Sequence, residues 1–309
     1  MEKKRKKVLV TGGAGFIGSN LTALLCEKGL QVTVLDDLSS GFKHLVPPEA
    51  SFIKGNVGDA KLLSRILPGM EAVFHLAATS TTTYSLSAPQ KYFENNFMNT
   101  VTLLEAMRKA AVKKIIYSSS ASSYGESGDQ FLKEGEATKP ISPYGASKYI
   151  VEPTLNAYYH CFGIESVALR YFNVYGPNDE QQGTRAVPKW AKAALTGKPI
   201  ELYWRGEQKR DYIFVRDIAR ANFFAFKHCI GARVYNVGTG TGVWMKDIIK
   251  EFERIMGRKL VVKEMGERPG DPKFAMADIG KIEKELGWRP ETDLPTGLKH
   301  TLDYFRKKL

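Results

Sequence analysis

The sequence predicts an α/β fold, in which a doubly wound parallel sheet is followed by a smaller C-terminal α/β lobe. Three observations predict it. Short apolar runs alternate with longer helical patterns through the first 175 residues, a glycine-rich turn follows the first run, and the rhythm changes after residue 175. Continuous apolar runs between helices are typical of parallel strands that are covered on both faces.

The first part is built from repeated strand and helix units. Strands are predicted at 7–12, 31–36, 51–56, 72–78, 113–120 and 165–176, and helices at 16–28, from 59, at 91–110 and from 142. No repeat, low-complexity segment or linker interrupts this alternation. The chain from 1 to 175 is therefore predicted to be one domain.

The second part, 176–309, begins with the polar loop "GPNDEQQGTR" and has shorter strands. These are predicted at 200–203, 212–215, 233–238 and 260–263. In open α/β sheets the ligand crevice lies at the carboxyl ends of the strands. We expect the smaller lobe to close over that crevice and to bind the substrate.

Composition and charge exclude several classes. The formal net charge is +12, but five of the basic residues lie together at 3–7 and the others are dispersed among acids. No recognised nucleic-acid module accompanies the charge, so nucleic-acid binding is not expected. No apolar run approaches the ~20 residues that span a bilayer, and no signal-type stretch precedes the first strand. We expect a cytoplasmic protein that does not enter a membrane.

The three cysteines, Cys26, Cys161 and Cys229, are widely separated, and the five histidines form no cluster with ligand spacing. An odd number of dispersed cysteines is a poor disulfide or metal pattern. No metal site is expected.

The glycine turn "TGGAGFIG" places Gly12, Gly15 and Gly18 between the first strand and the first helix. Glycines here allow a tight turn and close approach to a pyrophosphate, and the helix N-terminus attracts negative charge. Asp36 follows Gly18 by 18 residues, near the spacing expected for a carboxylate that binds the adenosine ribose. With Asp37 beside it and no arginine, a 2′-phosphate would be repelled. The turn predicts a Rossmann-like domain that binds NAD rather than NADP.

The stretch "SPYGASK" places Tyr144 and Lys148 on one helix face. Ser142 is a suitable N-cap and Pro143 suits the first helical position. A neighbouring ammonium and a positive nicotinamide ring would each favour the phenolate, which makes Tyr144 a candidate general base. Serines at the end of the strand before it, "YSSSASSYG", would lie on the crevice side.

Together, the glycine turn, the serine block and the Tyr-x-x-x-Lys spacing resemble the extended short-chain dehydrogenase/reductase family, over essentially the whole chain. Further motifs resemble the UDP-glucose and UDP-N-acetylglucosamine 4-epimerases of that family: "LDDLSSG", "HLAA", "RYFNVYG", "RDYIFVRD" and "RPGDPKFAMADIGK".

The resemblance implies a role for each matching position. Tyr144 would be the base, Lys148 would hold the nicotinamide ribose, and Ser120 would bind the reacting oxygen. The implied NAD contacts are Gly12, Gly15, Phe16, Ile17, Gly18, Asp36, Asp37, Ser39, Asn56, Val57, Leu76, Ala77, Ala78, Asn95, Ser118, Tyr144, Lys148 and Tyr171. The implied UDP-sugar contacts are Ser120, Asn173, Val187, Tyr203, Arg210, Arg268, Asp271 and Ala275.

The implied reaction is C4 epimerisation of UDP-hexoses through a 4-keto sugar, in a protein that the likeness indicates is a homodimer. Alternatives are a dehydratase, a decarboxylase, a uronic-acid epimerase or a non-catalytic NAD-binding sensor. Dehydratases and decarboxylases of the family carry an acid where this chain has Ser122, whereas sensors can lose the tyrosine and lysine that this chain keeps.

Several positions depart from common residues of the family. Asn56 stands where the family often has an aspartate that accepts from the adenine amino group, and the asparagine oxygen could do the same. Ala275 lies where the resemblance places the sugar's C2 substituent, and its small side chain predicts that N-acetylated sugars also fit. Trp204 and Arg205 replace a Gly-Asp pair near the uridine. Pro153 lies inside the helix of Tyr144 and predicts a kink, because proline removes a helix hydrogen bond.

Overall fold

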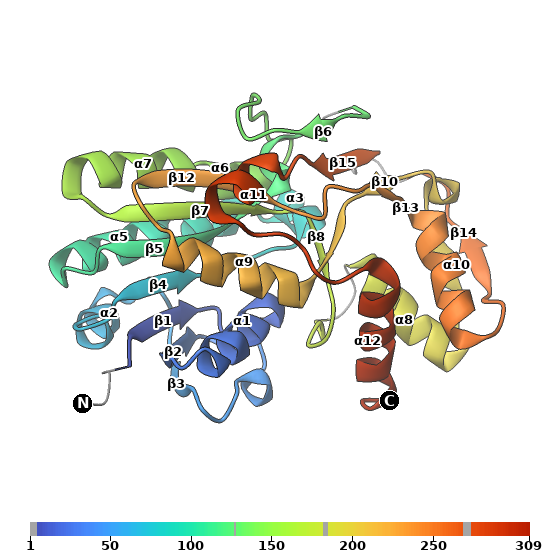
Figure 1. Cartoon of the computed structure of the whole chain (residues 1–309), viewed down its shortest axis with the longest axis horizontal. Coiled ribbons are helices and arrows are strands. Elements are labelled where there is room, and N and C mark those ends of the chain that lie inside the picture. Colours follow the sequence, from blue (N-terminus) through green and yellow to red (C-terminus); the bar gives the residue numbers. More distant parts are fainter. Residues whose placement is uncertain (1–4, 127, 182–184, 268–272) are drawn as a thin grey trace.

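A seven-stranded parallel sheet forms the centre of the protein, in the order β12-β7-β5-β4-β1-β2-β3 (Figure 1). The computed structural model describes residues 5–126, 128–181, 185–267 and 273–309. The strands of this sheet are β1 (Lys7–Thr11), β2 (Gln31–Asp36), β3 (Ser51–Lys54), β4 (Ala72–His75), β5 (Lys114–Ser120), β7 (Glu165–Tyr171) and β12 (Ala232–Val237). All neighbouring pairs are parallel, which confirms the predicted doubly wound fold.

Helices cover both faces of this sheet. One face carries α1 (Phe16–Glu27), α9 (Val215–Lys227) and α11 (Gly280–Leu286), and the other carries α2 (Ala60–Ile66), α5 (Asn99–Lys109) and α7 (Val151–Phe162). Each face has its own apolar core. Every residue of β4 is buried and only Lys7 of β1 is exposed, as expected of strands covered on both sides.

Three small sheets lie beside the large one, built mainly from the second part of the chain, with two short strands from residues before 176. They pair β9 (Ile200–Leu202) with β14 (Val262–Glu264), β8 (Asn173–Tyr175) with β11 (Tyr212–Phe214), and join β13 (Val243–Trp244), β10 (Lys209–Arg210), β15 (Phe274–Ala277) and β6 (Phe131–Leu132). With α8 (Ala186–Thr196), α10 (Met245–Met256) and α12 (Leu294–Arg306) they enclose a third core. Figure 1 shows these three helices grouped beside the large sheet.

Two strands differ from the prediction. The run at 165–176 is divided at Phe172 into β7 and β8, so that only β7 stays in the large sheet. The run at 233–238, assigned from sequence to the second lobe, forms β12 at the edge of the large sheet. That assignment is wrong, because the local pattern of a strand does not determine which strand it pairs with. The division at residue 175 therefore does not separate the large sheet from the small ones. The roles given to the two parts remain predictions.

Short helices connect the larger elements. They are η1 (Lys43–Leu45), α3 (Thr82–Ser87), α4 (Pro89–Tyr92), η2 (Phe93–Met98), η3 (Ala121–Ser123), α6 (Pro143–Tyr149) and η4 (Trp204–Gly206). The helix predicted at 91–110 is interrupted by η2, a π-helix. Between α6 and α7, Ile150 keeps helical dihedral angles, and α7 continues past Pro153. Pro153 therefore does not end the helix, as predicted. No helix among the described residues is long and apolar enough to cross a membrane.

Candidate functional site

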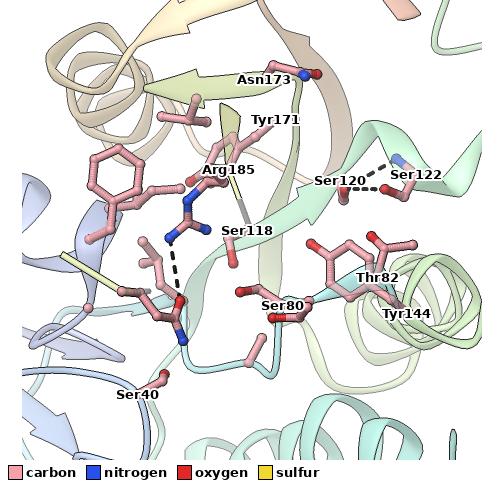
Figure 2. A pocket seen from close by; sticks show the side chains of 18 of the residues that line it. Ser40, Ser80, Thr82, Ser118, Ser120, Ser122, Tyr144, Tyr171, Asn173 and Arg185 are labelled. Atoms are coloured by element: carbon pink, nitrogen blue, oxygen red, sulfur yellow. Dashed lines mark hydrogen bonds between the residues drawn. The ribbon is translucent and has the colours of Figure 1, made fainter. Parts of the chain in front are cut away.

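A cavity of about 670 Å³ lies at the carboxyl ends of the strands of the large sheet and is closed by residues of the second part (Figure 2). Of the residues named from the sequence, those that line it are Gly12, Gly15, Phe16, Ile17, Gly18, Asp36, Asp37, Ser39, Asn56, Val57, Leu76, Ala77, Ala78, Asn95, Ser118, Ser120, Tyr144, Lys148, Tyr171, Asn173, Val187, Tyr203, Arg210 and Ala275. Arg268 and Asp271 lie outside the described residues.

The glycine turn has the geometry that a bound pyrophosphate needs. Gly12 has a φ of 72°, and a Cβ there would lie 2.6 Å from the backbone nitrogen of Ala77. A Cβ on Gly18 would lie 2.0 Å from the Gly12 carbonyl oxygen. Gly15 precedes the first residue of α1 and brings no side chain to cap it. The first N–H groups of α1 therefore border the cavity, as expected of an anion site.

Two carboxylates end β2 beside the turn. The Asp36 carboxylate accepts hydrogen bonds from the N–H groups of Ala14 and Leu38, each 2.9 Å long. Burial raises the pKa of Asp36, and these two bonds oppose that rise. Burial acts in the same direction on Asp37, but hydrogen bonds from Ser39 and Asn56 outweigh it. The pKa of Asp37 is therefore lowered. The pair presents negative charge where a 2′-phosphate would lie, and it fits a ribose with two free hydroxyls.

Asn56 is already held by other partners. Its Nδ2 donates to Asp37, while its Oδ1 accepts from the Gly58 N–H at 2.7 Å and from Asn99 Nδ2 at 3.2 Å. The oxygen that the sequence assigned to the adenine amino group thus carries two donors in the protein itself. Asn56 orders the β3 loop whether or not it also contacts the cofactor.

Tyr144 and Lys148 are placed by the start of α6. The Ser142 hydroxyl accepts a hydrogen bond from the Gly145 N–H at 3.1 Å, and Pro143 occupies the first turn. Lys148 lies one turn further and is buried, with its Nζ 3.4 Å from Ser118 Oγ and 4.5 Å from the centre of the Tyr117 ring. Figure 2 shows the Tyr144 hydroxyl, Ser118 and Ser120 directed into the same cavity.

Burial controls the titration of both side chains. It lowers the pKa of Lys148 to about 7, against the opposing charge of Glu152. It raises the pKa of Tyr144, whereas a hydrogen bond from Ser120 and the charge of Arg185 lower it. The sequence predicts that Lys148 lowers the pKa of Tyr144, but burial is the largest effect on this pKa and raises it. A positive nicotinamide ring would add the charge that favours the phenolate.

A buried ion pair lies one turn beyond Lys148. Glu152 accepts from Arg170 Nε at 3.0 Å and Nη2 at 2.6 Å, and from Ser119 Oγ at 2.6 Å. Both charged side chains are almost fully buried. Because Glu152 follows Lys148 by four residues, the pair fixes the helix that presents the lysine.

Residues that the sequence assigns to the substrate line the cavity from the second part. Arg210 of β10 lies in register with Ala275 of β15, so the two are neighbours across one strand pair. Tyr203 precedes η4, in which Trp204 and Arg205 have φ values of 54° and 50°. These positive values are uncommon for residues with side chains and mark a constrained turn.

Two features of the site were missed from the sequence. The π-helix η2 carries Asn95, whose Nδ2 donates to Thr79 Oγ1 at 3.0 Å, and a π-turn has no simple sequence signal. Arg185, in the polar loop region, points into the cavity (Figure 2). Its only sequence signal is a cation placed just before an amphipathic helix, which many surface helices share.

Comparisons with known proteins agree with this geometry. Residues 8–238 match the model of the NAD dependent epimerase/dehydratase family. A UDP-glucose 4-epimerase of Azospirillum brasilense is 34% identical over 311 residues, covering 94% of this chain and 89% of the relative.

Two solved structures extend the likeness. The Thermotoga maritima UDP-glucose 4-epimerase, solved with UDP-glucose, has a TM-score of 0.94 and 37% identity, covering 98% of this chain and 99% of the other. The Methanobrevibacter ruminantium UDP-N-acetylglucosamine 4-epimerase, solved with UDP-N-acetylmuramic acid, has a TM-score of 0.94 and 35% identity, covering 99% and 100%. The chain belongs to the NAD-dependent epimerase/dehydratase family.

Proposed function

We infer that this protein is an NAD-dependent UDP-hexose 4-epimerase that interconverts UDP-glucose and UDP-galactose. The observation that carries this is the meeting of Tyr144, Lys148 and Ser120 with the glycine turn in one cavity. Relatives at 34% to 37% identity over nearly the whole chain are named as UDP-glucose 4-epimerases, which supports the same reaction here.

The roles of the side chains follow from their positions. Bound NAD supplies the acceptance and return of two electrons at C4 of the sugar. Tyr144 takes the proton of the 4-hydroxyl group and later returns it to the 4-keto sugar. Ser120 orients that oxygen, and Lys148 holds the ribose while its positive charge favours the phenolate. The cavity lies under the second part, which limits water at the reacting carbon.

Ser122 favours epimerisation over dehydration. Its hydroxyl lies 3.2 Å from Ser120 Oγ, and Ser122 stands where dehydratases and decarboxylases of the family usually carry an acid. A serine does not supply the general acid or base that an elimination needs. The ketone is therefore expected to return to the alcohol rather than lose water.

Turnover of UDP-glucose tests the proposal. Nuclear magnetic resonance of the sugar should show UDP-galactose, while absorbance at the NADH band stays constant. Tyr144→Phe should lower kcat by roughly 10² to 10⁴-fold, because it removes the proton acceptor. Tyr149→Phe, on the same helix, is the matched control and should stay active. NAD binding without turnover would instead identify a sensor, and accumulation of NADH a dehydrogenase.

The substrate range is proposed to include UDP-N-acetylglucosamine. Ala275 lines the cavity beside Arg210, and its methyl group leaves space for an acetamido substituent. Ala275→Tyr should lower kcat/KM for UDP-N-acetylglucosamine at least tenfold more than for UDP-glucose. Wild type and Ala275→Tyr are each assayed with both sugars. Because the two sugars share the nucleotide, UDP-glucose serves as the control for each protein. Equal losses for both sugars would contradict the size argument.

A homodimer is proposed from exposed apolar side chains on η2, α6 and α7. Phe93, Met98, Ile150 and Phe162 are between 37% and 53% exposed. Sedimentation should give twice the mass of the chain, and Met98→Glu should shift the protein toward the monomer. A monomeric wild-type protein at micromolar concentration would refute this.

A further inference from the structure

Arg185 connects the second part of the chain to the glycine turn. It is the N-cap residue of α8, and its guanidinium carbon lies 5.2 Å from the centre of the Phe16 ring. Phe16 is the first residue of α1 and directly follows Gly15. Figure 2 shows the guanidinium directed into the cavity. A guanidinium from the second part therefore lies beside the N-terminus of α1.

Pro177 and Asn178, which precede Arg185 in the chain, contact the same helix. Asn20 Nδ2 donates to the carbonyl oxygen of Pro177 at 3.1 Å, and Asn178 Nδ2 donates to Ser19 Oγ at 3.0 Å. Both partners on α1 belong to its first two turns. These bonds hold the chain near Arg185 in register with the glycine turn.

A buried carboxylate orients the guanidinium. Arg185 Nε and Nη2 each lie 2.7 Å from an oxygen of Asp179, whose side chain is 0% exposed. Arg185 itself is 32% exposed. Its Nη2 also reaches Gln181 Oε1 at 3.5 Å, whereas Nη1 makes no hydrogen bond to any residue that the structure describes, and the side chain lines the cavity. A guanidinium held this way keeps the two N–H groups of Nη1 for phosphate oxygens.

The other three cations that line the cavity have neighbours away from α1. Lys148 lies beside Ser118, Lys189 pairs with Glu201, and Arg210 stands on β10 beside Ala275. Arg185 is the one among these four that packs on α1. The glycine turn alone offers a pyrophosphate N–H groups and a partial helix charge, but no formal positive charge.

We propose that Arg185 binds the pyrophosphate of NAD from across the cavity and thereby helps to retain the cofactor between turnovers, with Asp179 as its positioning residue. This rests on the assignment of the glycine turn to NAD. It makes the second part of the chain a contributor to cofactor binding, in addition to its role toward the sugar nucleotide.

Calorimetric titration of the full chain, freed of nucleotide, with ADP-ribose and with UDP tests this. ADP-ribose carries the pyrophosphate without the nicotinamide, and UDP represents the substrate. Arg185→Gln should weaken ADP-ribose binding by about 10- to 100-fold, the usual effect of losing a charged hydrogen bond. UDP binding should change less than twofold. The NAD content of the purified variant should fall in parallel.

Two further variants complete the design. Arg216→Gln is the matched control, because Arg216 also pairs with α1 through Glu27 but lies outside the cavity lining. It should bind ADP-ribose as the wild type does. Arg185→Lys keeps the charge without the fork and should show an intermediate loss, which preserves the test if Arg185→Gln does not fold.

The outcomes separate cleanly. Unchanged ADP-ribose binding in folded Arg185→Gln, or an equal or larger loss for UDP, would overturn the role of Arg185. A wild-type protein that binds no ADP-ribose would instead refute the cofactor assignment itself.

Discussion

At the scale of single residues, one helix face carries Tyr144, Lys148 and Glu152 in successive turns. The spacing of four aligns them, so that the proposed base, its neighbouring ammonium and a carboxylate form one column. Arg170 neutralises that carboxylate. The lysine is therefore buried beside a neutral ion pair, and its charge is only partly compensated.

Lys148→Met should stabilise the cofactor-free protein while it abolishes turnover. Burial lowers the pKa of Lys148 from 10.5 to about 7, so the folded state disfavours the charged form. A depressed lysine pKa costs stability in full below about pH 7, and the cost disappears as the pH rises toward 10.5. Replacement should raise the free energy of unfolding by a few kcal/mol at pH 6. Urea denaturation at pH 6 and 10 measures it, and an equal gain at both values would contradict this origin.

Glu152→Gln should change both stability and the pH dependence of kcat. It leaves Arg170 buried without its partner, which costs roughly 3–5 kcal/mol. It also removes the charge that raises the pKa of Lys148, so the alkaline limb of kcat should move to lower pH. The double variant Glu152→Gln/Arg170→Met should recover stability without restoring that limb. Recovery of both would mean that the pair acts only on folding.

At the scale of elements, the strand and helix units of the first part were predictable because their signals are local. Each strand is a short apolar run, and "SPYGASK" contains its own N-cap in Ser142. The glycine turn was predictable because its spacing is local, and Gly18 lies against the Gly12 carbonyl within one βαβ unit. The close approach of Gly12 to Leu76 and Ala77, after β4, is a contact that the local pattern does not state.

Other elements depend on contacts distant in sequence. β12 pairs with β7 although about 60 residues separate them, and no local pattern states that partner. Arg185 acquires its position from Asp179 and from α1, so its residue type alone gave no indication. The roles of Arg268 and Asp271 stay predictions, because both lie outside the described residues.

Asp211→Ala should loosen the junction between the large sheet and the small ones. Asp211 joins β10 to β11, and its carboxylate accepts from the N–H groups of Thr239, Gly240 and Ala277. Three buried N–H groups would lose their acceptor, for a loss of about 3–5 kcal/mol. Chemical denaturation measures this. Asp303→Ala, in a surface ion pair, should change stability by less than about 1 kcal/mol, and a similar effect of both would refute the explanation.

At the scale of the whole molecule, the chain crosses between its two parts more than once. The core on the α1 and α9 side joins Phe74 of β4 with Phe226 of α9 and Trp288 near the C-terminus. The cavity likewise takes residues from both parts. The core on the α2, α5 and α7 side is formed by the first part, with only Val234 added from the second. The core on the α1 and α9 side and the cavity need both parts, so the two should fold and unfold together.

Denaturation of the full chain should therefore follow one transition. All four tryptophans lie after residue 175, at Trp190, Trp204, Trp244 and Trp288, so their fluorescence reports on the second part. Far-ultraviolet circular dichroism reports mainly on the helices and strands of the whole chain. Because the core around Trp288 is shared with β1 and β4, the two signals should give the same urea midpoint.

A fragment of residues 1–175 provides the complementary measurement. It lacks β12 and α9, which leaves β7 as an unpaired edge and uncovers Phe74. The fragment should be unfolded or aggregated and should not bind ADP-ribose, even though it contains the whole glycine turn. NAD should raise the unfolding midpoint of the full chain for both signals equally, because ligand binding stabilises the shared folded state. Separate midpoints, or a folded fragment that binds ADP-ribose, would show that the first part is an independent domain.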